Sequence, residues 1–302
     1  MRRQLKKIAI AAAAAIASMG ILSVSNGWFD EAAADRAVKI YQEQYFDPAP
    51  GFYFDEHAAR VAIDLYPRHL CLSSAEWAGQ RFVLAEWQAA RLVAPVFGWK
   101  RECDGTRRYR QVILWVPRKN GKTEFAAGTS LLHLTQDGEA NGQIYCIAAK
   151  EEQSRIVFDA AKRMVSFSAT LRPHMELLKQ SIFFGRTFSS IQPLSGQPRG
   201  THGKSPSVIV GDEVHEWADD RLYKFLSQGA GARRQPIEWL ISTAGLTEGF
   251  GWELWGTSTN IQDGTLEDPE TLVVIFAADE DDDIWDPETW RKANPNFGIS
   301  PK

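Results

Sequence analysis

Residues 116–124 read V-P-R-K-N-G-K-T-E and have the chemistry of a phosphate-binding loop. The first N–H groups of a helix lack partners and can face an anion, while Lys122 reaches the outer phosphates and the Thr123 hydroxyl can bind Mg²⁺. The usual motif begins with a glycine, but Val116 occupies that position. A helix can also begin with Gly-Lys-Thr by chance, so the loop needs support from the rest of the chain.

Two acids, Asp212 and Glu213, follow the apolar run 207–210 and give that support. We expect Asp212 to hold Mg²⁺ alongside Thr123, and Glu213 to orient and deprotonate the water that attacks the γ-phosphate. A solvated strand end is the alternative for this pair. The loop and the acids, each at the end of an apolar run, favour hydrolysis of ATP or GTP.

Ser242 and Thr243 end a third apolar run, 237–241. Their hydroxyls can sense the γ-phosphate and pass its state onward, although small hydroxyl residues also mark simple strand-to-turn transitions. Three matches in this order strengthen the prediction of a nucleotide-hydrolysing site.

The sequence also offers candidate residues for contacting adenine and for supplying a cation that stabilises the transition state. The amide of Gln88 can donate to and accept from one edge of adenine; alternatively, Trp87 lies in the core and Gln88 on the surface. Arg199, in P-R-G-T-H-G, is the candidate for a positive charge delivered from a neighbouring subunit, and the alternative is a solvated loop arginine. Arg118 is its rival and would act within its own subunit.

The elements that must position these residues alternate between strands and helices. Strands are predicted from apolar runs and helices from helical spacing, with a hairpin around Gly185. The expected strands are 112–115, 143–149, 207–213, 237–243 and 271–278, the hairpin is 181–192, and the expected helices are 122–134 and 150–167. Residues 27–90 read as mostly helical. This order predicts an α/β fold with a mostly parallel central sheet and helices on both faces.

Composition is that of a soluble globular protein, with 44% hydrophobic and 24% charged residues among 302. The net charge of −4 gives no overall basic field for nucleic acid, although it does not exclude a local basic surface. The three cysteines, Cys71, Cys103 and Cys146, are widely spaced, which predicts reduced structural residues rather than a disulfide frame or a zinc site.

The N-terminus has the layout of a signal peptide, with four positive charges in residues 1–7 and an apolar stretch at 8–24. The stretch is short and rich in alanine for a membrane span, so we expect no stable membrane partner. The alternative is an alanine-rich helix. An ATP-driven protein lacks fuel outside the cell, so we interpret the segment as a non-functional signal.

Five segments in order resemble the ATPase domain of the large terminase subunit of tailed bacteriophages. They are W-Q, P-R-K-N-G-K-T, I-V-G-D-E-V-H-E, R-R-Q-P-I-E-W-L-I-S-T-A-G and W-R-K-A-N-P-N-F-G. The resemblance covers roughly residues 33–302 and implies a P-loop NTPase fold of the RecA/ASCE-like kind. The family's loop often lacks the first glycine and carries a basic residue, as Val116, Arg118 and Lys119 do here.

The resemblance also implies roles for single residues. Glu213 would be the catalytic glutamate, Gln88 would meet adenine, and Ser242 and Thr243 would couple hydrolysis to movement. The residues implied for nucleotide and Mg²⁺ binding are Pro117, Arg118, Lys119, Asn120, Gly121, Lys122 and Thr123, with Asp212 as the second metal ligand.

The implied function is an ATP-hydrolysing motor that drives double-stranded DNA into a procapsid. Its implied partners are the portal protein and the small terminase subunit, in a homo-oligomeric ring, a pentamer by resemblance. The implied location is the host cytoplasm, at the procapsid portal.

For domains, we expect an N-terminal helical segment at 1–65 and the ATPase domain at 66–302. The nuclease domain that large terminases usually carry is expected to be absent, because the acidic run 279–283 reads as a solvated loop and not a two-metal site. Arg233 and Arg234 are DNA contacts by charge alone, with a solvated loop as the alternative.

Other functions remain as alternatives. Residues 212–215 and 242–244 spell two motifs of DExH-type helicases, but a helicase needs a second such domain. A nucleotide-binding scaffold without turnover and a secreted protein with a chance Gly-Lys-Thr are the others.

Overall fold

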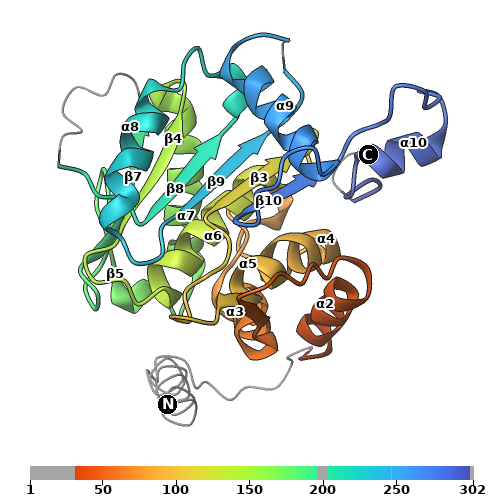
Figure 1. Ribbon diagram of the computed structural model, residues 1–302. Helices are drawn as coiled ribbons and strands as arrows, with labels where there is room; N and C mark the ends of the chain where they lie inside the picture. Colours follow the sequence, from red (N-terminus) through yellow and green to blue (C-terminus); the bar gives the residue numbers. More distant parts are fainter. Residues whose placement is uncertain (1–30, 196–202, 246, 300–302) are drawn as a thin grey trace.

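The computed structural model describes residues 31–195, 203–245 and 247–299, and an eight-stranded sheet lies at its centre (Figure 1). The order across the sheet is β10-β3-β9-β8-β4-β7-β6-β5, and the first six strands are parallel to one another. The strands are β3 (Gln111–Trp115), β4 (Gln143–Ala148), β5 (Met175–Leu177), β6 (Ile182–Phe184), β7 (Ser189–Ser195), β8 (Val208–Asp212), β9 (Ile237–Ser242) and β10 (Thr271–Ile275). The predicted mostly parallel sheet and the 181–192 hairpin are confirmed, since β6 and β7 pair antiparallel.

Helices cover both faces of the sheet, which explains why its strands read as continuous apolar runs. On one face, α6 (Lys122–Gln136) and α7 (Glu151–Phe167) share a core with Val112 and Leu114 of β3. On the other, Ile113 and Trp115 lie in a second core with residues of α8 (Arg221–Gly229) and α9 (Gly249–Gln262). The alternation of side chains along β3 thus assigns each residue to one core.

Helices also precede the sheet strands and pack beside α6 (Figure 1). They are α2 (Glu31–Gln44), α3 (Glu56–His69), α4 (Glu86–Gln88) and α5 (Ala94–Gly98), with a π-helical turn at Ala89–Val93 and the antiparallel pair β1 (Phe52–Phe54) and β2 (Trp99–Arg101). The Tyr66 hydroxyl of α3 lies 2.9 Å from Thr129 Oγ1 of α6. The boundary predicted after residue 65 falls inside α3, whose buried residues belong to the same core as α6.

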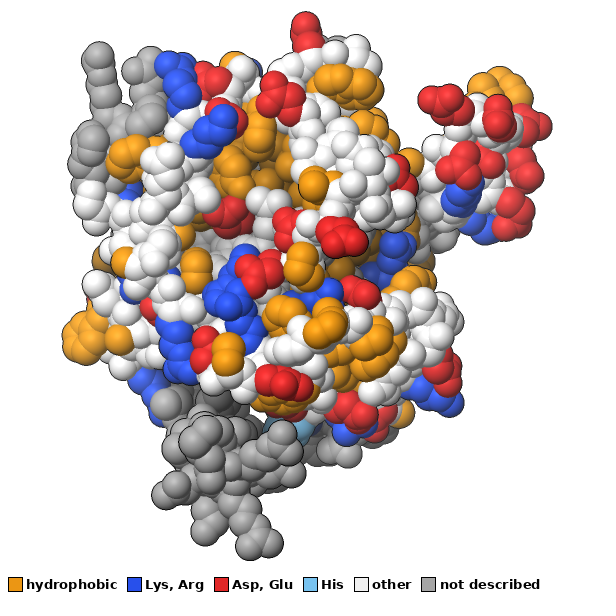
Figure 2. Space-filling model, viewed as in Figure 1, with side chains coloured by type: hydrophobic (Ala, Val, Ile, Leu, Met, Phe, Trp, Pro, Cys, Tyr) orange, Lys and Arg blue, Asp and Glu red, His pale blue; other side chains and the backbone are white. Residues whose placement is uncertain are grey.

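The last described residues form a projecting lobe around α10 (Pro287–Ala293). Figure 2 shows it covered mainly with acidic side chains. Asp279 and Asp282 are paired with Lys292 of α10, and most of the acidic run is exposed. In the part of the chain that the structure describes, no helix has the length and apolarity to cross a membrane, and the three cysteines are free thiols. The signal-like segment at 1–25 lies outside the described residues.

Short 3₁₀ turns connect the larger elements. They are Ala75–Trp77, Arg172–His174, Val214–Glu216 and Ala230–Ala232. The turn Val214–Glu216 follows β8 directly, so it carries the chain away from the acids at the end of that strand.

Candidate active site

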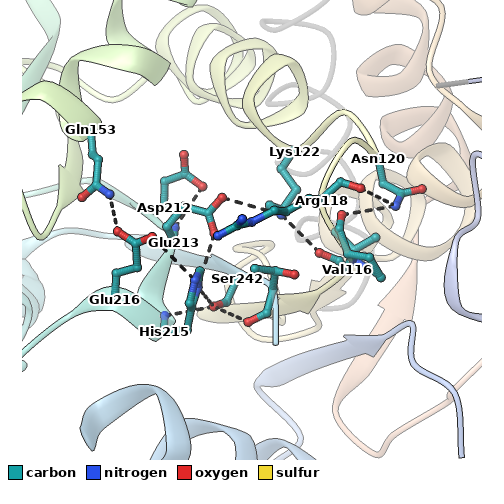
Figure 3. Close-up of polar contacts among 12 residues, drawn as sticks. Val116, Arg118, Asn120, Lys122, Gln153, Asp212, Glu213, His215, Glu216 and Ser242 are labelled. Atoms are coloured by element: carbon teal, nitrogen blue, oxygen red, sulfur yellow. Dashed lines mark hydrogen bonds and ion pairs between the residues drawn. The ribbon is translucent and has the colours of Figure 1, made fainter. Parts of the chain in front are cut away.

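Strand order brings the predicted site together. Strand β9 lies between β3, which leads into the loop, and β8, which ends in Asp212. Because all three strands are parallel, their carboxyl ends meet at one edge of the sheet, where α/β folds bind ligands. Figure 3 shows the side chains from these three strand ends directed toward one another.

The loop between β3 and α6 has an unusual backbone. Gly121, which caps α6, has a φ of 79°, and Lys119 has a φ of 65°. The left-handed region is open to glycine but unfavourable for a residue with a Cβ, so Lys119 must be held by its surroundings. A helix start preceded by such a turn directs backbone N–H groups outward, as phosphate binding requires.

Val116 occupies the position of the missing glycine without strain. Its side chain is buried in the core below the sheet edge, and its N–H donates to Ser242 O of β9 at 3.0 Å. The carbonyl of Val116 accepts a hydrogen bond from Lys122 Nζ at 3.3 Å. The residue therefore completes the strand and does not need the conformational freedom of glycine.

Lys122 is buried between the loop and the acids of β8. Its Nζ lies 3.7 Å from Glu213 Oε1. Burial lowers the pKa of Lys122, while Glu213 and Asp212 oppose that change by favouring the charged form. A cation enclosed by a carboxylate and a row of free helix N–H groups is suited to an anionic ligand.

Asp212 is buried at the end of β8, and its Oδ1 accepts from the Glu213 N–H at 3.0 Å. Burial and the neighbouring Glu213 raise the pKa of Asp212 to about 6. A bound cation would stabilise the charged carboxylate against both effects.

Glu213 has a φ of 47°, and its Oε2 is a buried oxygen with no hydrogen-bond donor. This carboxylate oxygen, 3.3 Å from His215 Nδ1, is placed to accept a proton from water.

These residues fit Mg²⁺. Among the described residues, no group of three or more histidine, cysteine or acidic side chains could hold a metal. Mg²⁺ in phosphate-binding sites uses one or two protein oxygens and takes the rest from phosphate and water. The Asp212 carboxylate and the half-buried Thr123 hydroxyl are the oxygens available here.

His215 links the acids to the end of β9. Its Nδ1 lies 3.3 Å from Glu213 Oε2 and 3.1 Å from Ser242 Oγ, and its backbone N–H donates to the same Ser242 hydroxyl at 3.0 Å. A Cβ on Gly245 would lie 2.4 Å from the Cβ of His215, so the next loop encloses the ring closely. The sequence predicted no role for His215 beyond its place in the DExH-type motif, two residues after Glu213.

Gln88 lies beside the phosphate loop and is buried, so the alternative that placed it on the surface is wrong. Its Oε1 accepts from the Ala85 N–H at 3.0 Å, and its Nε2 is 3.6 Å from where a Cβ on Gly121 would lie. Trp87 is buried against Phe276, as that alternative expected, with ring centroids 5.0 Å apart.

The structure describes the other predicted site residues, with the exception of Arg199. Arg118 and Lys119 are exposed on the loop, Pro117 is half-buried, and Asn120 and Thr243 are buried. Arg199 lies outside the described residues.

The two arginines before β9 are held by the protein itself. Arg233 is mostly buried and donates to the backbone carbonyls of Ser205 and Asn141 at 2.7 and 2.9 Å, which corrects its reading as a solvated arginine. Arg234 is exposed and donates to the Asp104 carbonyl.

Sequence analysis also missed a contact made by the C-terminal lobe. Asn294 and Asn296 bond to Asn120 of the loop. The sequence offers the family-like segment W-R-K-A-N-P-N-F-G and its turn-like N-P-N, neither of which reveals a partner far away in the chain.

Comparisons with known proteins agree with this geometry. A family model described as "Terminase large subunit, ATPase domain" matches residues 86–250. The large terminase subunit of Enterobacteria phage HK97 is 30% identical over 192 residues, covering 62% of this chain and 37% of that protein. Protein YmfN of Escherichia coli (strain K12) is 42% identical over 99 residues, 32% of this chain and 22% of that protein.

A solved structure gives the same result. The crystal structure of the HK97 large terminase superposes with a TM-score of 0.69 at 26% identity, covering 81% of this chain and 49% of that one. The chain therefore matches less than half of the length of each of these relatives.

Proposed function

Because this chain belongs to the family of large terminase subunits, through their ATPase domain, we propose that it binds ATP with Mg²⁺ and hydrolyses it to move double-stranded DNA into a procapsid. The observation that carries the proposal is the meeting of Lys122 with Asp212 and Glu213 across strand β9. The same family membership favours a packaging motor over the helicase and the secreted protein considered as alternatives.

Each site residue has a chemical task in this proposal. The loop N–H groups and Lys122 bind the phosphates, and Gln88 contacts adenine beside Gly121. Asp212 and Thr123 hold Mg²⁺, which supplies charge neutralisation on the phosphate oxygens.

Glu213 takes the proton of the attacking water on Oε2, and His215 keeps that carboxylate in place through its contacts with Glu213 and Ser242. Ser242 and Thr243, at the end of the strand between loop and acids, report the γ-phosphate to α9 and the following lobe.

The transition state gathers negative charge that a further cation must stabilise. Arg199 of a neighbouring subunit is the first candidate. Arg118, exposed on the same loop and near enough to Lys122 to lower its pKa, is the second. The partners in this proposal are DNA, the portal protein and the small terminase subunit, in a homo-oligomeric ring of the pentameric kind at the procapsid portal in the host cytoplasm.

The experiment that tests the proposal measures ATPase activity with and without double-stranded DNA. We expect Glu213→Gln to bind ATP with unchanged affinity and to lower kcat by roughly 10²–10⁴-fold, because the base is lost while the phosphate contacts remain. Lys122→Ala should lose ATP binding. Turnover of the Glu213→Gln variant at the wild-type rate would place the base elsewhere, and unchanged ATP affinity of Lys122→Ala would overturn the site.

A further inference from the structure

The C-terminal lobe is hydrogen-bonded to Asn120 of the phosphate loop. The backbone N–H of Asn296 donates to Asn120 Oδ1 at 3.1 Å, and Asn296 Nδ2 donates to the Asn120 carbonyl at 3.2 Å. In the other direction, Asn120 Nδ2 donates to Asn294 Oδ1 at 3.2 Å. Two asparagines from residues 294–296 thus bond to both the backbone and the side chain of one loop residue.

The asparagines are themselves held from two sides. Trp87 Nε1 donates to Asn296 Oδ1 at 2.9 Å. Both the backbone N–H and Nδ2 of Asn294 donate to the Trp290 carbonyl, at 2.9 and 3.1 Å, and so fix Asn294 to the end of α10. The contact therefore joins α4, α10 and the phosphate loop in one hydrogen-bonded group.

The loop needs such support because of its backbone. Asn120 lies between Lys119 and Gly121, the two residues with left-handed φ angles, and is completely buried. Its Nδ2 also donates to the carbonyls of Pro117 and Arg118, at 3.2 and 3.3 Å. The Asn120 side chain hydrogen-bonds to carbonyls within the turn, and Asn296 hydrogen-bonds to Asn120 from the C-terminal lobe.

Asn296 also lies close to the start of α6. A Cβ on Gly121 would come within 3.8 Å of Asn296 Nδ2 and 3.6 Å of Gln88 Nε2. The two amides therefore border the same residue, whose N–H opens the phosphate-binding helix end. A displaced Asn296 would remove two hydrogen bonds from Asn120 and one of the two amides beside Gly121.

We propose that Asn296, with Asn294 beside it, is a positioning residue that holds the phosphate loop in its nucleotide-binding shape. The proposal rests on the function proposed for this site, and it extends the site to the C-terminal lobe. Asn296 acts through Asn120 and needs no contact with nucleotide. A lobe that moved away from the loop would weaken nucleotide binding through the same contact.

The test compares variants in two measurements: the Kd for ATP by isothermal titration calorimetry, and hydrogen exchange of residues 116–121 without nucleotide. Asn296→Ala should weaken ATP binding about tenfold and raise loop exchange, while its Tm stays near that of the wild type. Asn296→Asp keeps the acceptor for Trp87 and the backbone N–H but lacks the side-chain donor to the Asn120 carbonyl, and it should show the same two effects. Asn260→Ala, an exposed asparagine on α9, is the matched control and should behave as wild type.

Failure of this inference is separable from failure of the proposed function. Wild-type protein that does not bind ATP would overturn the proposed function, and loop exchange would still decide the role of Asn296. Asn296→Asp protein that binds ATP and exchanges its loop amides as the wild type does would overturn the positioning role, even where Asn296→Ala fails to fold.

Discussion

His215 is the residue that most changes the description of the site. It contacts Glu213, which follows β8, and Ser242 at the end of β9, so one imidazole spans the two strand ends that carry the catalytic base and the hydroxyl. Gly245 leaves the space for it, since any larger residue there would clash with the ring. His215 therefore connects the Ser242 hydroxyl to the Glu213 carboxylate.

We expect His215→Ala to lower kcat for ATP by about 10- to 100-fold, because the imidazole beside Glu213 Oε2 no longer positions a base whose full contribution is about 10²–10⁴-fold. The KM for ATP should stay near the wild-type value, since Lys122 and the loop are unchanged. Steady-state ATPase kinetics check this, with the exposed His57→Ala of α3 as control. A raised KM with normal kcat would contradict the role assigned to His215.

Helix α6 connects the active site to a buried polar cluster at its far end. Trp239 Nε1 donates to His133 Nε2 at 3.0 Å, so the neutral ring carries its proton on Nδ1 and donates to Asp137 at 3.0 Å. Burial lowers the pKa of His133, although Asp137 opposes this. Burial would raise the pKa of Asp137, but Arg107 and His133 outweigh it and hold that pKa below its ordinary value.

This cluster predicts a loss of stability in mild acid. The unfolded chain protonates His133 near pH 6.5, while the folded protein does so only at lower pH. Between those values the unfolded state binds more protons, so the free energy of unfolding falls as pH drops below about 6.5. Urea unfolding at pH 7.5 and 5.0 measures the fall, and His133→Gln should reduce it. An equal fall in both proteins would assign the pH dependence to other groups.

At the scale of the whole molecule, the proposed function has two candidates for the cation that stabilises the transition state. Arg118 is exposed on the phosphate loop, and the sequence offers Arg199 as the residue supplied from outside. If Arg118 acts, one chain contains a complete active site. If Arg199 acts, two subunits together form each active site.

We expect Arg199→Ala and Glu213→Gln to be inactive separately and to regain ATPase activity when mixed. A subunit with intact Glu213 then receives Arg199 from its neighbour, and that active site is complete. ATPase assays on mixtures of varied ratio measure the recovery. Mixtures no more active than their components would favour Arg118, and Arg118→Ala would then be the variant that loses turnover.

The central strands and the site acids were predictable because each depends on local pattern. Residues 208–210 form an apolar run ending in two acids, and a parallel sheet brings such ends together. The contact of Asn296 with Asn120 joins residues 176 positions apart, and nothing in N-P-N specifies that partner. The boundary expected after residue 65 lies within α3, because helical patterning alone does not reveal that this helix shares a core with α6.

The position of β9 between β3 and β8 has a consequence for engineering this protein. Neighbouring strands lie about 4.8 Å apart. Because β9 lies between them, β3 and β8 are about 10 Å apart. Backbone hydrogen bonds set that width, and side-chain substitutions leave it unchanged. Directed evolution of the site residues can therefore adjust rate and affinity, whereas a wider or narrower ligand would require a strand to be inserted or removed.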